Sequence, residues 1–250
     1  MTNPDPHAAL REHLAELRLA QIAEIYQEVL NEAARKNCSP LDVLATLVAA
    51  EITARRERAL QRRIAAARLP KRKTLEEFDM AFPKRIPKQK VLRLFDCEFV
   101  AQHQSAVIIG PTGIGKTHLL TALGYTACER GVSVRFTRVV DMLNGLTAAQ
   151  INGTLAKALK VYTTPSLLLL DELGYLPIDK HGADLLFQII SYRYEQGSII
   201  ITSNRAFRDW PQIFNNDSTL TSAILDRLLH HAETILIDGK SYRMKDHLDS

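Results

Sequence analysis

Gly110-Pro111-Thr112-Gly113-Ile114-Gly115-Lys116-Thr117 matches the phosphate-binding loop pattern at every fixed position. The apolar run Ser105–Ile109 before it is typical of a buried strand, and the residues His118–Arg130 after it are typical of a helix. In such a unit the glycines let backbone N–H groups point inward, and the helix directs its positive end at the same anion. The stretch therefore predicts a nucleotide-phosphate site, with Lys116 on the β- and γ-phosphates and the Thr117 hydroxyl on Mg²⁺.

The overall composition is that of a globular protein. The chain has 250 residues, enough for one good-sized domain and a smaller one, and 46% of them are hydrophobic. No apolar run approaches the ~18 residues needed to span a bilayer. The polar N-terminus with its two prolines shows no secretory signal. We therefore expect a cytoplasmic protein without a membrane partner.

The cysteines and histidines show no metal-ligand pattern. Cys38, Cys97 and Cys128 are widely spaced and lack a CxxC pair, which is typical of reduced thiols. His230 and His231 are adjacent in sequence, and adjacent residues on a helix point in different directions, so we expect the same of these two side chains. Metal binding by protein side chains alone is therefore not expected.

Basic residues are concentrated in one part of the chain. The formal net charge is +4, yet residues 52–90 hold 13 Lys/Arg against 4 Asp/Glu, a local net charge of +9. The rest of the chain is correspondingly acidic. This asymmetry suggests an element that binds a polyanion, attached to a neutral or acidic domain.

Residues 1–73 are predicted to form a small helical module. Leu10–Leu30 carries apolar residues at a mostly helical spacing. Ser39-Pro40 is typical of an N-cap followed by proline at the first helical position, and Leu41–Leu69 continues as one helix or two until Pro70. So few residues make a weak core, and we expect this module to be helped by contacts with DNA, a partner or further copies of itself.

Residues 74–250 are predicted to form an α/β domain. Prolines at 83 and 87 break any long helix ahead of the phosphate loop. The expected strands are 105–109, 132–137, 166–170, 198–202 and 234–237, and the expected later helices are 141–162 (with a break near Asn152-Gly153), 183–195 and 219–230. Five short apolar strands separated by helices imply a parallel five-stranded sheet flanked by helices on both faces.

Two adjacent carboxylates follow the apolar run Leu167–Leu170. This Asp171-Glu172 pair, about 55 residues beyond Lys116, forms a Walker-B pattern. Asp171 would hold Mg²⁺, and Glu172 would act as general base on the attacking water. Small-molecule kinases need no such glutamate, because their substrate supplies the nucleophile. The pair therefore favours hydrolysis over phosphoryl transfer.

Two further polar residues have plausible catalytic positions. Asn204 follows the apolar run Ile199–Ile201 and could place its amide between the γ-phosphate and the water, although a turn residue would look the same. Arg227 lies on a predicted helix just ahead of the last strand. Presented to a neighbouring subunit, it would neutralise charge in the transition state; a solvated arginine paired with Asp226 is the alternative.

Five segments together resemble one family. This chain is similar to the IstB-like transposition helper ATPases of bacterial insertion sequences. The similarity lies in the order and spacing of the segments GPTGIGKTHLL, LLLLDELGY, IIITSNR, LDRLLHHAE and GKSYRMK. These belong to the AAA+ branch that holds the DnaC-type helicase loaders and DnaA-type initiators. The resemblance covers essentially the whole chain. It implies a P-loop AAA+ core, ATP and Mg²⁺ as cofactors, ATP hydrolysis, a cognate transposase as partner, and a homo-oligomer with ATP-bridged interfaces.

The resemblance also implies roles for single residues. Asn204 falls on the sensor-1 position, Arg227 on the arginine-finger position and Arg243 on a sensor-2-like position. Phe78 and Phe82 fall in the segment that packs near the adenine.

Two positions qualify the match. His118 follows the loop as in the family motif GKTHL, and we count it with the nucleotide-binding residues. We expect it to pack against neighbouring residues rather than to take part in catalysis. Only 11 residues follow Gly239, so the helical lid of AAA+ proteins is expected to be reduced or absent, which leaves the role of Arg243 open.

The basic run from Arg55 to Lys73 is interpreted as a DNA contact. It has nine basic side chains, one acid and no interleaved aromatic rings, which favours phosphates of duplex DNA over base stacking on single strands. A solvated helical face is the alternative. The predicted DNA-binding residues are Arg55, Arg56, Arg58, Arg62, Arg63, Arg68, Lys71, Arg72 and Lys73.

These features together favour an ATPase that assembles on duplex DNA and assists a transposase. Three other functions are alternatives to this interpretation. A helicase loader of the DnaC type would share the core but would prefer single strands and dock on a helicase. A P-loop kinase for a small metabolite would not need the acidic pair, the strand-end Asn204 or Arg227. A nucleotide switch without hydrolysis would serve only as a scaffold.

Overall fold

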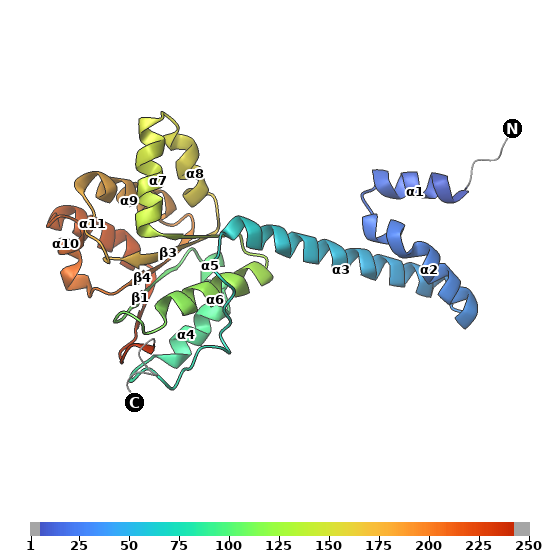
Figure 1. Cartoon of the computed structure of the whole chain (residues 1–250), viewed down its shortest axis with the longest axis horizontal. Helices are drawn as coiled ribbons and strands as arrows, with labels where there is room; N and C mark the ends of the chain where they lie inside the picture. The colour runs from blue at the N-terminus through green and yellow to red at the C-terminus, as the bar shows by residue number, and fades with distance from the viewer. Residues whose placement is uncertain (1–5, 243–250) are drawn as a thin grey trace. The chain divides into compact units, whose positions relative to one another are not determined.

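The computed structural model describes residues 6–242, and its helices and strands are labelled in Figure 1. The chain divides into two compact units, Met1–Arg62 and Arg63–Ser250. The boundary lies inside α3 (Pro40–Ala67), a helix of 28 residues. Among the described residues, none of the helices is both long and apolar enough to cross a membrane.

The N-terminal unit begins with two helices. α1 (Pro6–Glu16) and α2 (Ala20–Lys36) are separated at Arg18, whose positive φ of 56° ends the helical path. The helical spacing of apolar residues over Leu10–Leu30 is thus shared between two helices. The new start is capped from α3, because the buried Glu51 carboxylate accepts hydrogen bonds from the backbone N–H groups of Gln21 and Ile22 at 2.8 and 3.3 Å. Local spacing cannot reveal a cap that lies 30 residues away.

α3 begins as the sequence predicts. The Ser39 hydroxyl accepts a hydrogen bond from the backbone N–H of Asp42 at 3.2 Å, and the Asp42 carboxylate accepts one from the N–H of Ser39 at 3.1 Å. This reciprocal cap places Pro40 at the first helical position. Large apolar side chains that are exposed along the helix at helical spacing are Leu41, Leu44, Val48 and Ile52.

The second unit contains the predicted five-stranded parallel sheet. Its strands are β1 (Ser105–Ile109), β2 (Val134–Arg138), β3 (Leu167–Leu173), β4 (Ser198–Ser203) and β5 (Ala232–Leu236). They run in the order β2-β3-β4-β1-β5, and every pair is parallel. All carboxyl ends therefore meet at one edge, with β1 and β3 on either side of β4.

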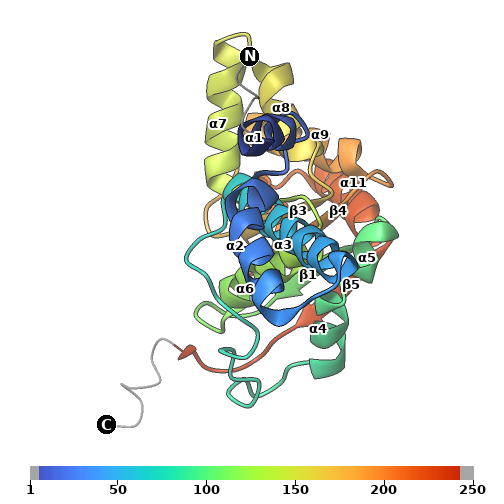
Figure 2. The same ribbon diagram turned by 90° about the vertical axis from the view of Figure 1, so that its right-hand side faces the viewer.

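Helices cover both faces of this sheet (Figures 1 and 2). One face carries α7 (Val139–Ile151), α9 (Lys180–Arg193) and α11 (Ser218–Leu229), with α8 (Leu155–Thr163) beside α7; the other carries α4 (Lys88–Phe95) and α6 (Lys116–Glu129). Short helical segments are α5 (Glu98–Ala101), Phe207–Asp209 and α10 (Trp210–Ile213). No α-helix follows β5 within residues 6–242.

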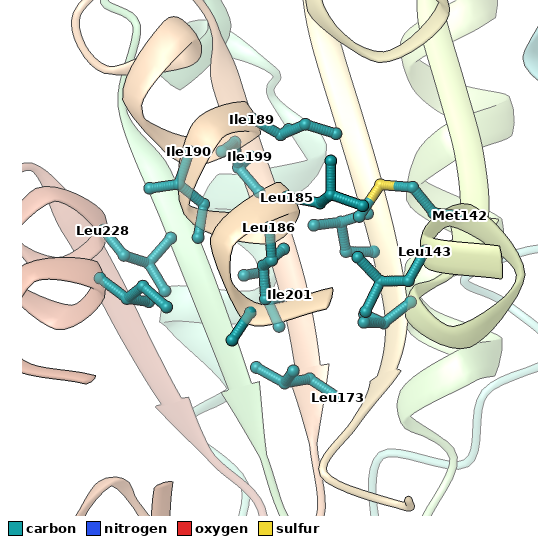
Figure 3. Close-up of a cluster of buried hydrophobic side chains, with 14 of the residues drawn as sticks. Met142, Leu143, Leu173, Leu185, Leu186, Ile189, Ile190, Ile199, Ile201 and Leu228 are labelled. Carbon is teal, nitrogen blue, oxygen red and sulfur yellow. The ribbon is translucent and has the colours of Figure 1, made fainter. Parts of the chain in front are cut away.

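A core of aliphatic side chains fixes the strands under α7, α9 and α11 (Figure 3). Met142 of α7 and Leu186 of α9 are fully buried in one cluster with Ile201 of β4. Along β1, Val107 and Ile109 belong to this cluster, as alternation across a strand requires. Burying each such side chain contributes about 1.5–3 kcal/mol. The strand ends that carry the candidate site are thus held by a rigid support.

Arg193 joins the amino ends of β3 and β4. Arg193 is 1% exposed, and its guanidinium donates hydrogen bonds to the backbone carbonyls of Tyr162, Thr163, Pro165, Ser166 and Ser198. Carbonyl groups that would otherwise be buried without partners are satisfied in this way.

The segment after the unit boundary lies against α6. Arg63 donates to the carbonyl of Cys128 at 2.9 Å, and the Tyr125 hydroxyl donates to the carbonyl of Pro70 at 3.1 Å. Ala67 is fully buried. The second compact unit begins at Arg63, whereas the sequence analysis divides the chain between residues 73 and 74.

Candidate nucleotide-binding site

The phosphate loop has the backbone that its glycines predict. Gly113 and Gly115 have φ angles of 80° and 98°, in the region that glycine adopts without strain. A Cβ atom at Gly115 would also lie only 2.6 Å from the Phe78 ring. The loop leads directly into α6, whose first residue is Lys116, so the positive end of the helix lies at the loop.

Lys116 is the buried cation of this site. The residue is 5% exposed, and its ammonium donates to the carbonyl oxygens of Gly110 at 2.7 Å and Pro111 at 2.9 Å. A buried ammonium without such partners would carry a large desolvation cost. The loop carbonyls thus hold the charge at the phosphate cradle.

A cavity of about 210 Å³ adjoins the loop. Loop residues Gly113–Thr117 line one part of it, and the aromatic side chains of Phe78, Phe82 and Tyr242 line another. The Phe82 and Tyr242 rings meet edge to face, with centroids 4.8 Å apart. Glu172 lines the same cavity. Aromatic surface beside an anion cradle fits a nucleotide, whose base has aromatic faces and whose phosphates are charged.

His118 connects α6 to the segment that carries the aromatic residues. Its Nε2 lies 2.8 Å from the carbonyl oxygen of Thr74, and its ring meets Phe78 edge to face at 5.5 Å. It also lines the cavity. These contacts fit the packing role that the sequence suggested.

The strand β3 carries a β-bulge at its two acidic residues. Pairing with β4 is regular up to Leu170 and resumes at Leu173, so β3 contains one extra residue. Glu172 has a positive φ of 65°, which is uncommon for a residue other than glycine. Asp171 is 2% exposed, whereas Glu172 reaches the cavity. The bulge gives two adjacent carboxylates different environments.

Thr202 holds this acidic pair from the neighbouring strand. Its hydroxyl donates a hydrogen bond to the Asp171 carboxylate and accepts one from the backbone N–H of Glu172 at 3.0 Å. The side chain is fully buried in β4. Sequence reasoning missed Thr202, because local spacing does not reveal that β4 lies next to β3.

Arg138, an arginine that the sequence analysis did not single out, lies beside the same acidic pair. Arg138 is the register partner of Asp171 at the end of β2. Its guanidinium binds the Asp141 carboxylate through two hydrogen bonds, at 2.7 and 3.1 Å. These bonds raise the pKa of Arg138, and the charges of Glu172 and Asp171 add to the effect.

Asn204 lies next to the start of the phosphate loop. It follows β4 directly, and the backbone N–H of Gly110 donates to the carbonyl of Ser203 at 3.1 Å. The side-chain Oδ1 of Asn204 is buried, and no atom of residues 6–242 forms a hydrogen bond with it. An unpaired buried acceptor costs about 1–3 kcal/mol, which favours a role toward a polar ligand.

Comparison with known proteins agrees with this geometry. Residues 12–250 match the model of one family, described as IstB-like ATP binding protein. The chain belongs to the IstB-like ATP-binding family. It is 40% identical over 238 residues to a protein of Bacillus thuringiensis subsp. berliner named as an ATP-binding protein of insertion sequence IS232, covering 95% of both chains. It is 38% identical to the similarly named IS21 protein of Pseudomonas aeruginosa, covering 93% of this chain and 88% of that one.

Solved structures show the same fold as this IstB-like chain. A replication initiator DnaA bound to AMPPCP and single-stranded DNA superposes with a TM-score of 0.59 at 25% identity, covering 73% of this chain and 56% of that one. The DnaC helicase loader gives a TM-score of 0.52 at 25% identity, covering 64% and 96%. The predicted P-loop AAA+ fold is therefore confirmed, and so is the resemblance to IstB-like proteins.

Arg227 does not line the nucleotide cavity of its own chain. It lies on α11, where its guanidinium stacks on the Phe187 ring at 4.8 Å and donates to the carbonyl of Ala223 at 3.2 Å. It lines a hollow together with Ser105 and Ile199, at the amino ends of β1 and β4. Arg243, the sensor-2-like position, lies outside the described residues.

Four of the nine predicted DNA-binding residues have partners within the protein. Arg55 and Arg58 both pair with the buried Glu51 carboxylate at 3.0 Å. Arg63 binds the Cys128 carbonyl, and Arg72 lies 3.4 Å from Glu129. Residues that are exposed and have no hydrogen-bond or ion-pair partner within 6–242 are Arg56, Arg62, Arg68, Lys71 and Lys73.

Proposed function

We propose that this protein is a cytoplasmic AAA+ ATPase that assembles on duplex DNA and assists the transposase of an insertion sequence. One observation carries the ATPase part of the proposal: Lys116 and Thr117 at the start of α6 line the same cavity as Glu172 of β3.

The residues that line this cavity, together with the buried Asp171 next to Glu172, fit ATP and Mg²⁺. Lys116 would bind the β- and γ-phosphates at the start of α6. The Thr117 hydroxyl and the Asp171 carboxylate would hold Mg²⁺, since oxygen ligands are what this ion prefers. The ion neutralises charge on the phosphates when it is bound.

Glu172 and Asn204 would act on the attacking water. The positive φ of Glu172 turns its carboxylate away from the buried course of β3 and toward the cavity, where it would accept a proton from water. The unpaired Oδ1 of Asn204 is an acceptor that a water molecule could satisfy. Hydrolysis would then release or remodel the assembly.

Arg227 would act on the ATP of a neighbouring copy. Its position at the other end of the sheet excludes a direct contact with the ATP of its own chain. A subunit interface that brings it to the neighbour's γ-phosphate would bridge two copies through ATP, and this arrangement would make assembly depend on the nucleotide.

Duplex DNA and a transposase are the proposed partners. The relatives at 38–40% identity are named for insertion sequences, and the net charge of +9 over residues 52–90 suits a polyanion. A helicase loader remains the second candidate, favoured by the likeness to the DnaC loader.

Phosphate release from ATP tests the catalytic part. Glu172→Gln should retain ATP binding and lose about 10²–10⁴-fold in turnover, because the amide cannot take the proton. Lys116→Ala should lose nucleotide binding. Glu98→Gln, an exposed acid on α5, is the matched control and should keep the parent rate. Turnover by Glu172→Gln at the parent rate would reject Glu172 as the base.

Strand-transfer assays test the partner. Adding the parent protein with ATP should raise the yield of the transposase from the same insertion sequence, and Lys116→Ala should not. Equal yields with both proteins would reject an ATP-dependent helper role.

A further inference from the structure

We propose that Glu195, His230 and His231 form a binding site for one transition-metal ion of the Zn²⁺ class. This site lies at the amino edge of the sheet, whereas the phosphate loop lies at the carboxyl edge. Glu195 precedes β4 and His231 precedes β5, and the backbone N–H of Ser105 at the start of β1 donates to the carbonyl of His231 at 2.9 Å. The inference does not depend on the proposed function.

The two histidines are neighbours in space as well as in sequence. Their ring centroids lie 4.0 Å apart, so the expectation that they point in different directions is wrong. The reason is that α11 ends at Leu229, and both residues belong to the turn before β5. Helical periodicity therefore does not apply to them.

The carboxylate of Glu195 completes a compact group of ligand atoms. One ligand atom from each of the three residues lies within 4.8 Å of the other two, and Nε2 of His231 is 3.9 Å from Oε1 of Glu195. A bound ion would draw these atoms to about 2.0–2.2 Å from itself. All three side chains are exposed, so rotation about their side-chain torsions can bring the three ligand atoms to these distances from one ion.

Tyr194 orients one of the two imidazoles. Its hydroxyl lies 2.7 Å from Nδ1 of His230, and the two rings stack with centroids 5.9 Å apart. A partner on Nδ1 leaves Nε2 of this ring as the ligand atom. Outer hydrogen bonds of this kind are what fix metal-binding histidines in other proteins.

The ligand set determines the class of ion. Two imidazole nitrogens and one carboxylate oxygen suit Zn²⁺, Co²⁺ or Ni²⁺, whereas Ca²⁺ and Mg²⁺ prefer oxygen ligands alone. Three protein ligands leave a further position for water. Arg227 lines the same hollow as Glu195 and His231, but its guanidinium is stacked on Phe187 rather than paired with the carboxylate.

Calorimetric titration of the full chain with Zn²⁺, after treatment with a chelator, tests the site. All proteins carry Cys38→Ser, because Cys38 is an exposed thiol and could itself bind the ion. The parent should bind one Zn²⁺ per chain, and Zn²⁺ should raise its Tm. His231→Ala and Glu195→Gln should each weaken binding by about tenfold or more, and Tyr194→Phe should weaken it less.

His13→Ala is the matched control, since His13 is an exposed histidine on α1. It should bind Zn²⁺ as the parent does. Circular dichroism without metal verifies that the variants are folded. Unchanged stoichiometry and affinity in a His230→Ala/His231→Ala variant would overturn the proposal, as would a parent that binds no Zn²⁺ at millimolar concentration.

Discussion

Thr202 fixes the position of Asp171 from the neighbouring strand. Its buried hydroxyl donates to the Asp171 carboxylate and accepts from the backbone N–H of Glu172. The same hydroxyl therefore orients the proposed Mg²⁺ ligand and stabilises the bulge that turns the proposed base toward the cavity. The geometry of the acidic pair thus depends on a residue that does not line the cavity.

Thr202→Val tests this dependence. Valine fills the same volume but removes the hydroxyl, which leaves Asp171 and the N–H of Glu172 without this partner. Loss of a buried hydrogen-bond partner costs about 1–3 kcal/mol in stability. We expect Thr202→Val to lower the unfolding free energy by this amount and to reduce ATP turnover more than ATP binding.

Thr202→Ser supplies the control, because it restores the hydroxyl without the methyl group. It should recover most of the turnover. If Val and Ser variants turned over ATP equally well, the hydroxyl would have no role in positioning the pair.

Mixed assemblies test Arg227. Arg227→Ala leaves the phosphate loop intact, and Lys116→Ala leaves Arg227 intact, so each variant alone should be inactive. A mixture should regain activity, because some interfaces combine an intact loop with an intact arginine. No recovery in the mixture would place Arg227 outside the neighbouring site.

Phe187→Leu separates this role from simple packing. It removes the ring on which Arg227 stacks, an interaction worth about 0.5–2 kcal/mol, and keeps the guanidinium. We expect a lower Tm with turnover retained. Equal losses of turnover in Phe187→Leu and Arg227→Ala would indicate a purely structural arginine.

Salt dependence tests the basic stretch. The triple variant Arg56→Ala/Arg62→Ala/Arg68→Ala removes three exposed side chains without ion-pair partners in the described chain. Its log–log slope of duplex affinity against salt should be shallower by about 2.7, at about 0.9 per phosphate contact. Lys157→Ala/Lys160→Ala, on the exposed side of α8, is the control and should keep the parent slope.

Thiol reactivity tests the burial of α6. Burial raises the pKa of the Cys128 thiol to about 11, and burial also raises the pKa of the Cys97 thiol. At pH 8 only the exposed Cys38 should react quickly with a thiol reagent. The folded-state pKa of Cys128 lies above the ordinary thiol value of about 8.5. The buried neutral thiol therefore makes its full contribution to the free energy of unfolding below about pH 8.5, and this contribution is lost as the pH rises to about 11. Rapid modification of Cys128 at pH 8 in folded protein would contradict the packing of α6.

The sequence predicted the parts of the fold that depend on local pattern. β1 has the predicted limits Ser105–Ile109, and the break between α7 and α8 lies at Asn152-Gly153 as expected. Motifs made of residues that are consecutive in the sequence, such as the phosphate loop and the acidic pair, were also predicted. These features need no knowledge of how distant segments pack.

Features that depend on tertiary contacts were not predicted. Glu51 caps α2 from another helix, and this cap accompanies the break at Arg18. Thr202 reaches Asp171 only because β4 lies beside β3. The proximity of His230 and His231 follows from the end of α11, which the sequence placed one residue too late.

The most direct test of the account is DNA binding by Glu172→Gln in ATP and in ADP, on duplex and single-stranded DNA, with the particle mass recorded. The account predicts a large assembly that binds duplex DNA in ATP and dissociates in ADP. Preference for single strands would instead support a helicase loader, and no DNA binding in either nucleotide would contradict the proposed function.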